Sequence, residues 1–548
     1  MLFHSFAFIF ILLPCAVAGC ELIRRFPGMR SASGTPAGAS LSGGQDGMLT
    51  ELYLRRFLAA VSAVFALFSG LYSAAVLAAN IAVNALFILF LRRCPKKAKA
   101  LRNAGVILNL GMLAAFKYTG VRFPLAISFY TFQQISLLAD LAAGKIRVDR
   151  PSDYLLSVLF FPKLIQGPIS KYDDIIPEAS LDSGLDSRAL AAGKRALFLA
   201  PLTADRLLSG TALFTFGLAK KTLLADTLGA AADYAYASIP TLTGTDAFLA
   251  ALTYALQLYF DFSGYCDMGM GAARMLGIEF DGSLINFRSP FKSLTMEELW
   301  RHWHASLMRF FRDYVYIPLG GSRRGERRTL LNLVIVFFLS GLWHGNGLNF
   351  IVWGLANGAM VLIDRKFLRR ISSSASSLPK PLSALVCFLL RVKTFVLFSL
   401  VFVFFRAPDL AGALSLFRQM LTGTRGRISA GFAEAFRMKE LWYVLKVMPA
   451  VNGVSFADTS AGRIFCLAAL LIACAALVFL APSARQAADR MLSPVPEADP
   501  APEGAEYHPA RETTGGRIRL FHVVFVSVLF VWALTAVPGV STFLYANF

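Results

Sequence analysis

His344 is the residue whose type and position in this sequence point most directly to chemistry. The 548 residues contain only six histidines, and His344 lies near the middle of the uncharged run 329–363. An ionisable side chain inside an apolar run is costly to accommodate, so it is a functional candidate by default. Gly345, which follows it, would allow another backbone or a ligand to approach the imidazole closely. The alternative is a histidine at a helix end that bonds a neighbouring carbonyl.

A second polar cluster lies at residues 300–312, which contain two histidines, two tryptophans and three arginines. This segment is too polar for a helix that faces lipid. In one continuous helix Trp300, Trp303 and His304 would share a face by i, i+3, i+4 spacing, whereas His302 would point elsewhere. The alternative is an amphipathic helix at the membrane interface, with aromatic and arginine anchors.

The composition indicates that the elements around these residues are membrane helices. Hydrophobic residues make up 56% of the chain and charged residues 16%, and the mean hydropathy is +0.57. Soluble domains average about 25% charged residues. The apolar residues also come in long runs that suit the thickness of a bilayer. We predict an all-α polytopic membrane protein with about ten to twelve transmembrane helices, plus re-entrant or interfacial helices.

The apolar runs and the basic segments between them predict the topology. Residues 57–91 carry no charge, and as one helix they would be about 52 Å long against a hydrocarbon core of about 30 Å. They are therefore expected to form two helices with a break at Ser69-Gly70. Segment 92–102 holds six basic residues and no acidic one, so we place it in the cytoplasm and the N-terminus outside. Residues 2–20 lack a basic n-region and are interpreted as a retained helix.

The rest of the chain is interpreted as one membrane domain over 1–548. Further uncharged runs lie at 207–219, 247–260, 329–363, 394–405, 464–482 and 520–538. The run 329–363 is interrupted by His344-Gly345-Asn346-Gly347, so we expect it to be split as well. A flexible cytoplasmic loop is predicted at 29–48, a disordered loop at 494–514, and a last helix with a C-terminal tail at 520–548.

Charge and cysteine content exclude two classes of function. The net charge is +20, from 54 Lys and Arg and 34 Asp and Glu. The basic residues cluster at the ends of apolar runs, which is typical of loops at an anionic membrane surface and not of nucleic-acid binding. The seven cysteines form no CxxC pair, so we expect neither a metal site nor a disulfide framework. A transporter whose histidines relay protons remains an alternative from another class.

Several motifs in one order give the chain a resemblance to a known family. They include Phe-Phe-Pro-Lys-Leu-Ile-Gln-Gly-Pro-Ile at 160–169, Tyr-Phe-Asp-Phe-Ser-Gly-Tyr-Cys-Asp-Met at 259–268, Trp-Arg-x-Trp-His at 300–304, Arg-Asp-Tyr-x-Tyr-Ile-Pro-Leu-Gly-Gly at 312–321 and Gly-Leu-Trp-His-Gly at 341–345. With these residues the chain resembles the membrane-bound O-acyltransferase (MBOAT) superfamily. Within it, the chain is most similar to the AlgI-like branch of bacterial alginate O-acetylation proteins, with the DltB-like D-alanyl transfer proteins as cousins. The family-like core covers about 100–410.

The resemblance implies an enzyme of the bacterial inner membrane that passes acyl groups, with acetyl expected, from a cytoplasmic thioester to an exopolysaccharide or cell-wall glycan. It implies His344 as the catalytic histidine and His304 as the second one. It implies acetyl-CoA as co-substrate, no bound cofactor, and a periplasmic or membrane-anchored partner of the esterase fold. D-alanyl transfer to teichoic acid is the runner-up. We assign to the donor or substrate channel Trp300, Trp303, Arg301, Arg312, Asp313, Asp261 and Asp267.

The chain also departs from the family pattern, and its end carries one more candidate. His302 stands where the family usually has a second arginine, and the inserts around 422–460 and 482–517 look unlike the common pattern. The last six residues resemble the Phe-x-Tyr-x-x-Phe ending of this branch, in which the phenol of Tyr545 could relay the acyl group. The alternative for Tyr545 is an aromatic anchor at the outer membrane interface.

Overall fold

The computed structural model describes residues 2–25, 45–176, 202–280, 282–368, 378–436, 456–492 and 520–537. These residues form helices joined by short connections, and the ladder-type pairing among them is limited to one isolated antiparallel bridge between Phe287 and Trp303. The prediction of an all-α fold is confirmed.

The helices vary widely in length along the chain. The longer ones are α1 (Leu13–Arg25), α2 (Gln45–Phe68), α3 (Leu71–Arg93), α4 (Ala98–Tyr118), α5 (Ile127–Ala142), α10 (Ala204–Ala219), α11 (Asp226–Ala237), α12 (Gly244–Met275), α15 (Glu326–His344), α16 (Leu348–Ile363), α18 (Lys380–Arg406), α19 (Leu410–Thr422), α22 (Ser460–Phe479) and α24 (Leu520–Ala536). The shorter α-helices are α6 (Pro151–Leu159), α7 (Phe161–Leu164), α8 (Tyr172–Ile175), α13 (Met296–His302), α14 (Ala305–Phe311), α20 (Ala430–Ala435) and α23 (Ala484–Leu492). The π-helical turns are η1 (Phe8–Leu12), η5 (Lys220–Ala225), η9 (Arg312–Tyr316) and η10 (Asp364–Leu368), and the 3-10 turns are η3 (Pro95–Lys97), η6 (Ile239–Thr241), η7 (Gly282–Leu284), η8 (Pro290–Lys292) and η11 (Phe456–Asp458).

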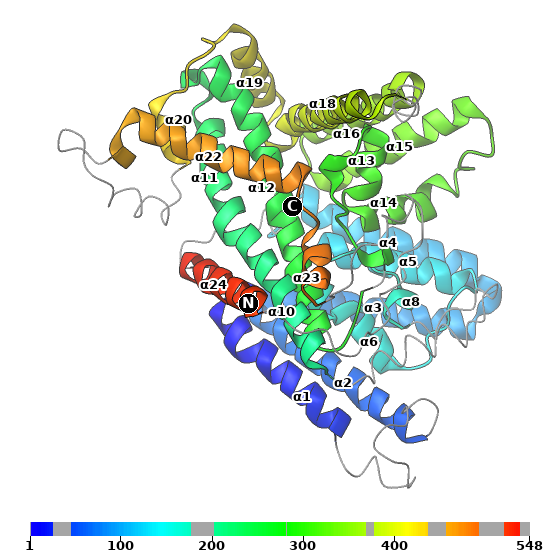
Figure 1. The fold of residues 1–548 in the computed structure, drawn as a ribbon. Helices are drawn as coiled ribbons and strands as arrows, with labels where there is room; N and C mark the ends of the chain where they lie inside the picture. The colour runs from blue at the N-terminus through cyan, green and yellow to red at the C-terminus, as the bar shows by residue number, and fades with distance from the viewer. Residues whose placement is uncertain are drawn as a thin grey trace.

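Helix α12 is the centre of the fold, and α10 packs along it (Figure 1). The two backbones touch because glycines face each other where the helices cross. A Cβ atom on Gly217 would lie 2.5 Å from the carbonyl oxygen of Gly264, and one on Gly264 would lie 2.8 Å from that of Gly217. Small residues that allow such close approach are a common device for packing helices within membranes.

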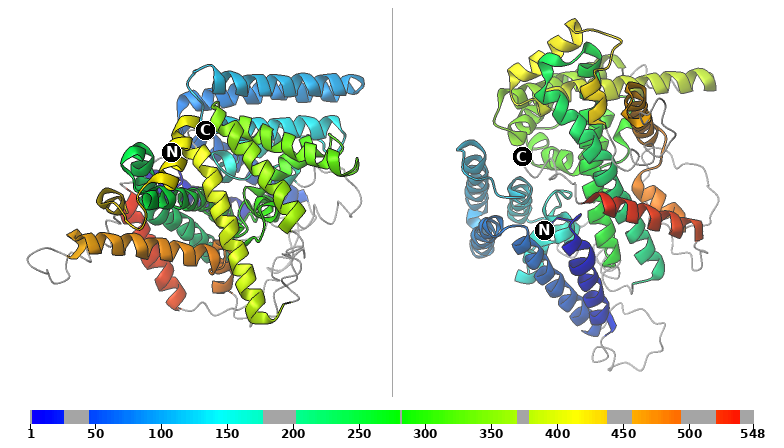
Figure 2. Two further views of the ribbon diagram at one scale, coloured as in Figure 1. Left: turned by 90° about the horizontal axis from the view of Figure 1, so that it is seen from above. Right: turned by 90° about the vertical axis from the view of Figure 1, so that its left-hand side faces the viewer.

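Two further groups of helices lie against this centre. Helices α3, α4 and α5 pack on one another, and α15, α16 and α18 form a second group in which α18 contacts α12. Figure 1 shows both groups on the right-hand side of α12. Helices α1 and α2 pair with each other in the lower part of that view. Figure 2 shows α22 and α24 at the periphery. The candidate histidines belong to the region where the α15 group meets the α5 group.

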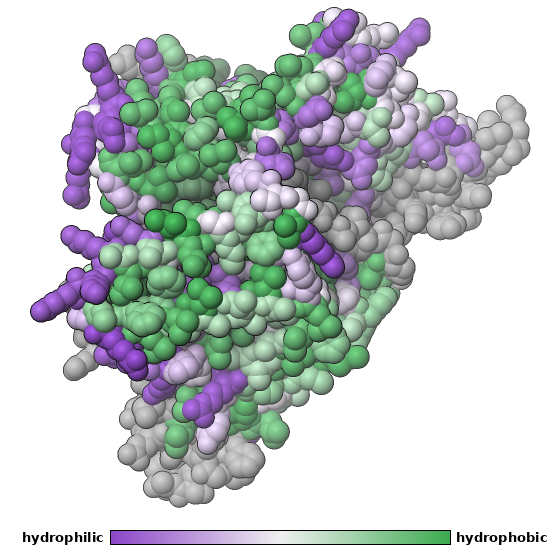
Figure 3. Space-filling view, turned by 180° about the vertical axis from the view of Figure 1, so that it is seen from behind, coloured by the Kyte–Doolittle hydropathy of each residue, from purple (hydrophilic) through white to green (hydrophobic). Residues whose placement is uncertain are grey.

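The surface and the helix lengths identify a membrane protein. Among the described residues, three helices are both long and apolar enough to cross a bilayer: α3, α18 and α22. Helix α24 is equally apolar but shorter. Seen from behind, hydrophobic side chains cover broad areas of the surface, with hydrophilic ones gathered toward its edges (Figure 3). The expected total of about ten to twelve crossings stays a prediction.

Two helix breaks predicted from the sequence are confirmed. Helix α2 ends at Phe68 and α3 begins at Leu71, with Gly70 at a φ of +140° in the break. Helix α15 ends at His344 and α16 begins at Leu348, so the long run 329–363 is two helices. Glycine adopts such a positive φ at little cost, which explains why the first break falls there.

The contact between α10 and α12 gives a test of the fold. Gly264→Leu places side-chain atoms against the backbone of Gly217, so we expect it to destabilise the protein by about 1–3 kcal/mol or more through overpacking. The measurement is the thermal midpoint of the purified protein in detergent. Gly111→Leu on α4 is the matched control, because nothing lies within 4 Å of a Cβ at that position. Equal midpoints for the two variants would contradict the close glycine contact.

Candidate active site

His344 is the last residue of α15, at a point where that helix ends inside the protein. Its side chain is 3% exposed. The imidazole lies among aromatic rings, with centroid distances of 4.6 Å to Trp343, 4.9 Å to Trp353 and 5.0 Å to Phe405. His344 is therefore at a helix end, as in the alternative interpretation of the sequence, and it is also buried among aromatic rings inside the protein.

Close packing of α15 against α16 fixes the position of His344. A Cβ on Gly341 would lie 2.4 Å from the carbonyl oxygen of Phe350, and one on Gly354 would lie 2.4 Å from that of Phe337. The two helices thus touch backbone to backbone within one turn of His344. Because a larger side chain at either glycine would push the helices apart, the position of the imidazole depends on both glycines.

His304 lies in a tight turn between two short helices. Helix α13 ends at His302, and α14 begins at Ala305. His304 has φ 46° and ψ 46°, which is the left-handed region that non-glycine residues seldom occupy. The expectation of one continuous helix through Trp300 and His304 is therefore wrong, and so is the alternative of one amphipathic interfacial helix. The turn buries His304, whose side chain is 1% exposed.

Asn286 holds this turn in its unfavourable conformation. Its backbone carbonyl accepts a hydrogen bond from the amide of Ala305 at 3.1 Å. Its side-chain Oδ1 accepts two more from Ser306, one from the amide at 3.2 Å and one from the hydroxyl at 2.6 Å. A left-handed non-glycine residue costs about 1–2 kcal/mol, and such strain persists only where the surroundings impose it. We identify Asn286 as the residue that imposes it on His304.

The two histidines meet at one indole ring. The centroid of Trp343 is 4.6 Å from that of His344 and 6.2 Å from that of His304. Phe262 lies 4.8 Å from His304 on the α12 side, and Phe129 of α5 lies 6.3 Å away. Residues from four separate elements therefore enclose one buried site with two imidazoles. Such a site can supply a base and a second polar group to the same reactant.

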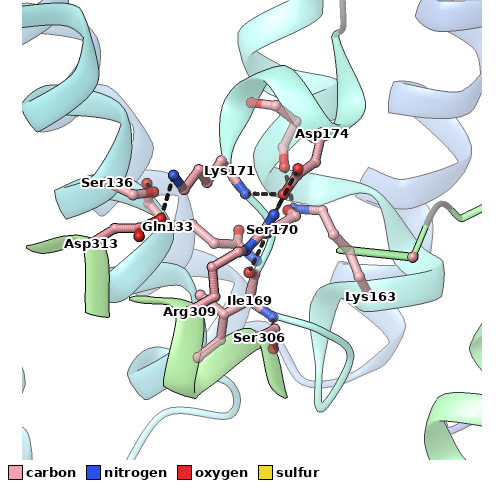
Figure 4. A network of polar contacts seen from close by, with 12 residues as sticks. Gln133, Ser136, Lys163, Ile169, Ser170, Lys171, Asp174, Ser306, Arg309 and Asp313 are labelled. Atoms are coloured by element: carbon pink, nitrogen blue, oxygen red, sulfur yellow. Dashed lines mark hydrogen bonds and ion pairs between the residues drawn. The ribbon is translucent and has the colours of Figure 1, made fainter. Parts of the chain in front are cut away.

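A polar network anchors α14, whose first turn carries His304 (Figure 4). The Ser306 hydroxyl accepts a hydrogen bond from the amide of Ile169 at 2.9 Å. One turn later the guanidinium of Arg309 binds both carboxylate oxygens of Asp174, one of them at 3.0 Å. Two-point pairs between arginine and carboxylate fix orientation as well as distance. The segment around Ile169 and Asp174 thus holds α14 in addition to Asn286.

The same network continues into η9, where Asp313 lies. Asp313 pairs with Lys171 at 2.7 Å and with Arg312 at 2.7 Å. Burial alone would raise the pKa of the Asp313 carboxyl, but hydrogen bonds from Arg312 and Lys171 outweigh burial and hold this pKa below its usual value. Asp313 is therefore a charged anchor for the chain between α14 and α15.

The other predicted channel residues are distributed unevenly around the histidines. Trp300 and Trp303 are buried in the aromatic cluster: Trp300 lies 5.8 Å from Trp353, and Trp303 lies 4.7 Å from Phe398. Arg301 points away from the cluster. Its side chain is 69% exposed and pairs with a glutamate one turn earlier in α13. Arg312 is also largely exposed.

Asp261 and Asp267 lie on α12 in buried ion pairs. Lys221 is 2.7 Å from Asp261 and 3.0 Å from Asp226, and Lys220 is 2.6 Å from Asp267. Both lysines belong to the π-helical turn η5 that follows α10. The two aspartates therefore join α10 to α12 through charge pairs, in addition to any contact with a substrate.

Some features predicted from the sequence lie outside the residues that the structure describes. Tyr545, the tail 543–548 and the loop 494–514 lie outside the described residues, as do most of 29–48 and part of the two inserts. Within the described part of the chain, no group of three or more His, Cys, Asp or Glu side chains is placed to hold a metal ion.

Asn286 and Ser306 are not among the residues predicted from the sequence. Asn286 precedes His304 by 18 residues, and no helical or strand spacing connects the two positions. Asn286 follows the mixed segment Glu-Phe-Asp-Gly-Ser-Leu-Ile at 279–285 and lies well before the motif at 300–304, so no local signal marks it. Such a residue is identified only when the turn it supports is seen.

Comparison with known proteins finds a match to a family of membrane-bound acyltransferases over part of the chain. Residues 151–405 match the model of "MBOAT, membrane-bound O-acyltransferase family". This span contains Asn286, both candidate histidines, and the contacts of α14 with Ile169 and Asp174. The match confirms the resemblance that the motifs predicted.

Curated relatives match about half of the chain. The peptidoglycan O-acetyltransferase of Helicobacter pylori is 34% identical over 362 residues, which are 58% of this chain and 64% of the relative. The "Probable alginate O-acetylase AlgI" of Pseudomonas aeruginosa is 35% identical over 322 residues, or 58% of this chain and 55% of the relative. The teichoic acid D-alanyltransferase of Bacillus subtilis is 26% identical over 248 residues, or 43% and 58%. The match thus spans roughly half to two thirds of each relative's length.

The role of Asn286 can be tested by substitution. Asn286→Ala removes the acceptor of both Ser306 hydrogen bonds, so the turn relaxes and His304 loses its position. We expect acyl-transfer activity to fall about 10- to 100-fold, the effect of losing one or two buried hydrogen bonds at a site. Because Asn286 and Ser306 share a hydrogen bond, the double variant with Ser306→Ala should lose less than the sum of the two single losses.

The control for this prediction is Asn84→Ala. Asn84 is also a fully buried asparagine, but it bonds Asn80 and Asn109 between α3 and α4, away from the histidines. Its loss should lower the thermal midpoint and leave the activity of the folded protein near the wild-type value. Strictly additive losses in the Asn286 and Ser306 double variant would contradict a shared role.

Proposed function

We propose, from the premise that residues 151–405 form a domain of the membrane-bound O-acyltransferase family, that the protein transfers acyl groups within the membrane. The acyl group is acetyl, the donor is acetyl-CoA on the cytoplasmic side, and the acceptor is an exopolysaccharide or cell-wall glycan. The observation that carries this proposal is the pair of buried imidazoles that meet at Trp343 inside that domain.

The chemistry of transfer needs the groups that this site contains. A neutral imidazole, assigned to His344, removes the proton of the acceptor hydroxyl as its oxygen attacks the thioester carbonyl. The carbonyl π electrons move onto oxygen, and a second polar group, assigned to His304, stabilises that oxyanion. When the intermediate collapses, the C–S bond breaks and the thiolate takes the proton from the His344 imidazolium. The products are an ester and a free thiol, and the imidazole is neutral again.

The relatives support the choice of acyl group and acceptor. Two of them are named for O-acetylation, one of peptidoglycan and one of alginate. A third is named for D-alanyl transfer to teichoic acid at lower identity, so we rank D-alanyl transfer second. We further propose a partner protein of the esterase fold on the outer side, and Tyr545 as an acyl relay to it.

The contact between α4 and α15 supports an orientation in the membrane. Helix α4 begins after the exposed basic turn Pro95–Lys97, and α15 begins at Glu326 beside the exposed Arg323 and Arg324. The far ends of the two helices meet, where the Tyr118 hydroxyl donates to the carbonyl of Leu342 at 2.7 Å. Each helix is about 30 Å long, and because their C-terminal ends meet, their basic N-terminal segments lie on the same side of the membrane. Basic segments favour the cytoplasmic side. We therefore propose an inner-membrane protein with its N-terminus outside.

The orientation predicts the accessibility of the turn before α4. A cysteine introduced as Ala98→Cys in a cysteine-free background should be shielded from an impermeant thiol reagent in intact cells, because the turn lies inside. It should react once the membrane is made permeable. Labelling in intact cells, with a cytosolic marker unlabelled, would reverse the orientation and the side proposed for the donor.

The transfer reaction predicts the effect of removing His344. With labelled acetyl-CoA and purified protein in detergent, wild type should consume the thioester, and His344→Ala should lower the rate by about 10³-fold or more because the base is lost. His302→Ala is the matched control, since His302 lies on α13 with its Nδ1 3.1 Å from the Ser293 hydroxyl. Activity of His344→Ala within a few-fold of wild type would make His344 structural. Accumulation of substrate in vesicles without thioester loss would favour the transporter.

A further inference from the structure

The last residues of α4 contact the end of α15 next to His344. The ammonium of Lys117 donates a hydrogen bond to the backbone carbonyl of Trp343. The hydroxyl of Tyr118 donates to the carbonyl of Leu342 at 2.7 Å. These two carbonyls belong to the residues directly before His344. More than 200 residues separate the donors from the acceptors in sequence.

The two contacts solve a problem that every helix end poses. The last four carbonyls of an α-helix have no amide partner within the helix. At the end of α15 the amide of Gly345 donates a hydrogen bond to the carbonyl of Gly341 at 3.3 Å. The next two carbonyls, of Leu342 and Trp343, accept hydrogen bonds from α4. A cation at this end also faces the negative pole of the helix dipole. The final turn of α15 is therefore held by another helix.

The surroundings of Lys117 show how closely it is tied to the site. Its Nζ lies 5.7 Å from the ring centroid of Trp343 and 5.8 Å from that of Phe123. Trp343 is the indole that both His304 and His344 contact. A charged side chain in such apolar surroundings is costly unless it makes specific contacts.

We propose that Lys117 and Tyr118 are positioning residues for His344. They hold the final turn of α15 so that the imidazole keeps its place against Trp343 and His304. This rests on the proposed function, because it assigns a role within that site. Neither residue lies in the span 151–405 that matches the family.

Tyr118 allows a clean test because it contributes little to packing. Its side chain lies at the surface, 46% exposed, while α4 packs through other residues such as Asn109 and Leu113. Tyr118→Phe therefore removes one hydroxyl and leaves the ring. Tyr72→Phe is the matched control, since the Tyr72 hydroxyl also bonds a backbone carbonyl, that of Arg122, at 2.8 Å.

For the tyrosine pair we expect a split between kinetic constants. Tyr118→Phe should lower kcat about 5- to 10-fold, the worth of one neutral hydrogen bond, with KM for the thioester unchanged within about twofold. Tyr72→Phe should keep kcat within about twofold of wild type. Equal kcat values for the two variants, or a change confined to KM, would overturn the proposal.

For the lysine we expect rescue by a residue of the same charge. Lys117→Met should lower kcat about 30- to 100-fold because a charged donor is lost, whereas Lys117→Arg should retain at least about a tenth of wild-type kcat. Lys99→Met, at an exposed position on the same helix, should have no effect. Equal losses for Met and Arg would reduce Lys117 to a packing residue and overturn its role.

A second readout separates this proposal from the proposed function. Hydrogen exchange of the amides 342–346 reports the final turn of α15 whether or not the protein turns over a thioester. Tyr118→Phe and Lys117→Met should speed exchange there and leave α16 unchanged, and the Tyr72 variant should behave as wild type. Unchanged hydrogen exchange at 342–346 in both variants would overturn the positioning role of Lys117 and Tyr118. If the wild type does not consume acetyl-CoA but the two variants still exchange faster at 342–346, the positioning role stands and the proposed transfer reaction is rejected.

Discussion

A helix that ends inside an apolar interior leaves carbonyls and amides that water cannot satisfy, and some other part of the chain must bond them. Both candidate histidines lie at such ends. The end of α15 receives donors from Lys117 and Tyr118 of α4, and the start of α14 is bonded by Asn286. The same groups that satisfy the backbone also fix the imidazoles. In this molecule the need to bond buried helix ends and the need to aim two side chains are met by one set of contacts.

The buried charge pairs on α12 depend on the close packing of α10 against α12. The backbones of α10 and α12 touch at Gly217 and Gly264, so the turn after α10 comes close to α12. That turn carries the lysines that pair with Asp261 and Asp267. Losing one partner of a buried pair costs about 3–5 kcal/mol because the other charge is left uncompensated. A change at either aspartate would therefore affect stability as well as any role toward a substrate.

What could be predicted from the sequence depended on how local each feature is. The all-α fold and the breaks at Gly70 and His344 follow from charge, hydropathy and glycine within a few residues. His304, a candidate from the sequence, lies buried beside Trp343, but the continuous helix expected around it does not form, because Asn286, 18 residues away, holds the left-handed turn. The role of Lys117 was out of reach for the same reason: its partner carbonyl lies 226 residues further along. Contacts across the chain decide these positions, and spacing along it does not report them.

The placement of both histidines on terminal turns has a consequence for heat tolerance. Terminal turns of a helix generally open more easily than its centre, and local opening costs less free energy than global unfolding. Here few side chains oppose that opening: Lys117 and Tyr118 at the end of α15, and Asn286 at the start of α14. The heat tolerance of the site is therefore expected to depend on these few contacts more than on the packing of the whole bundle.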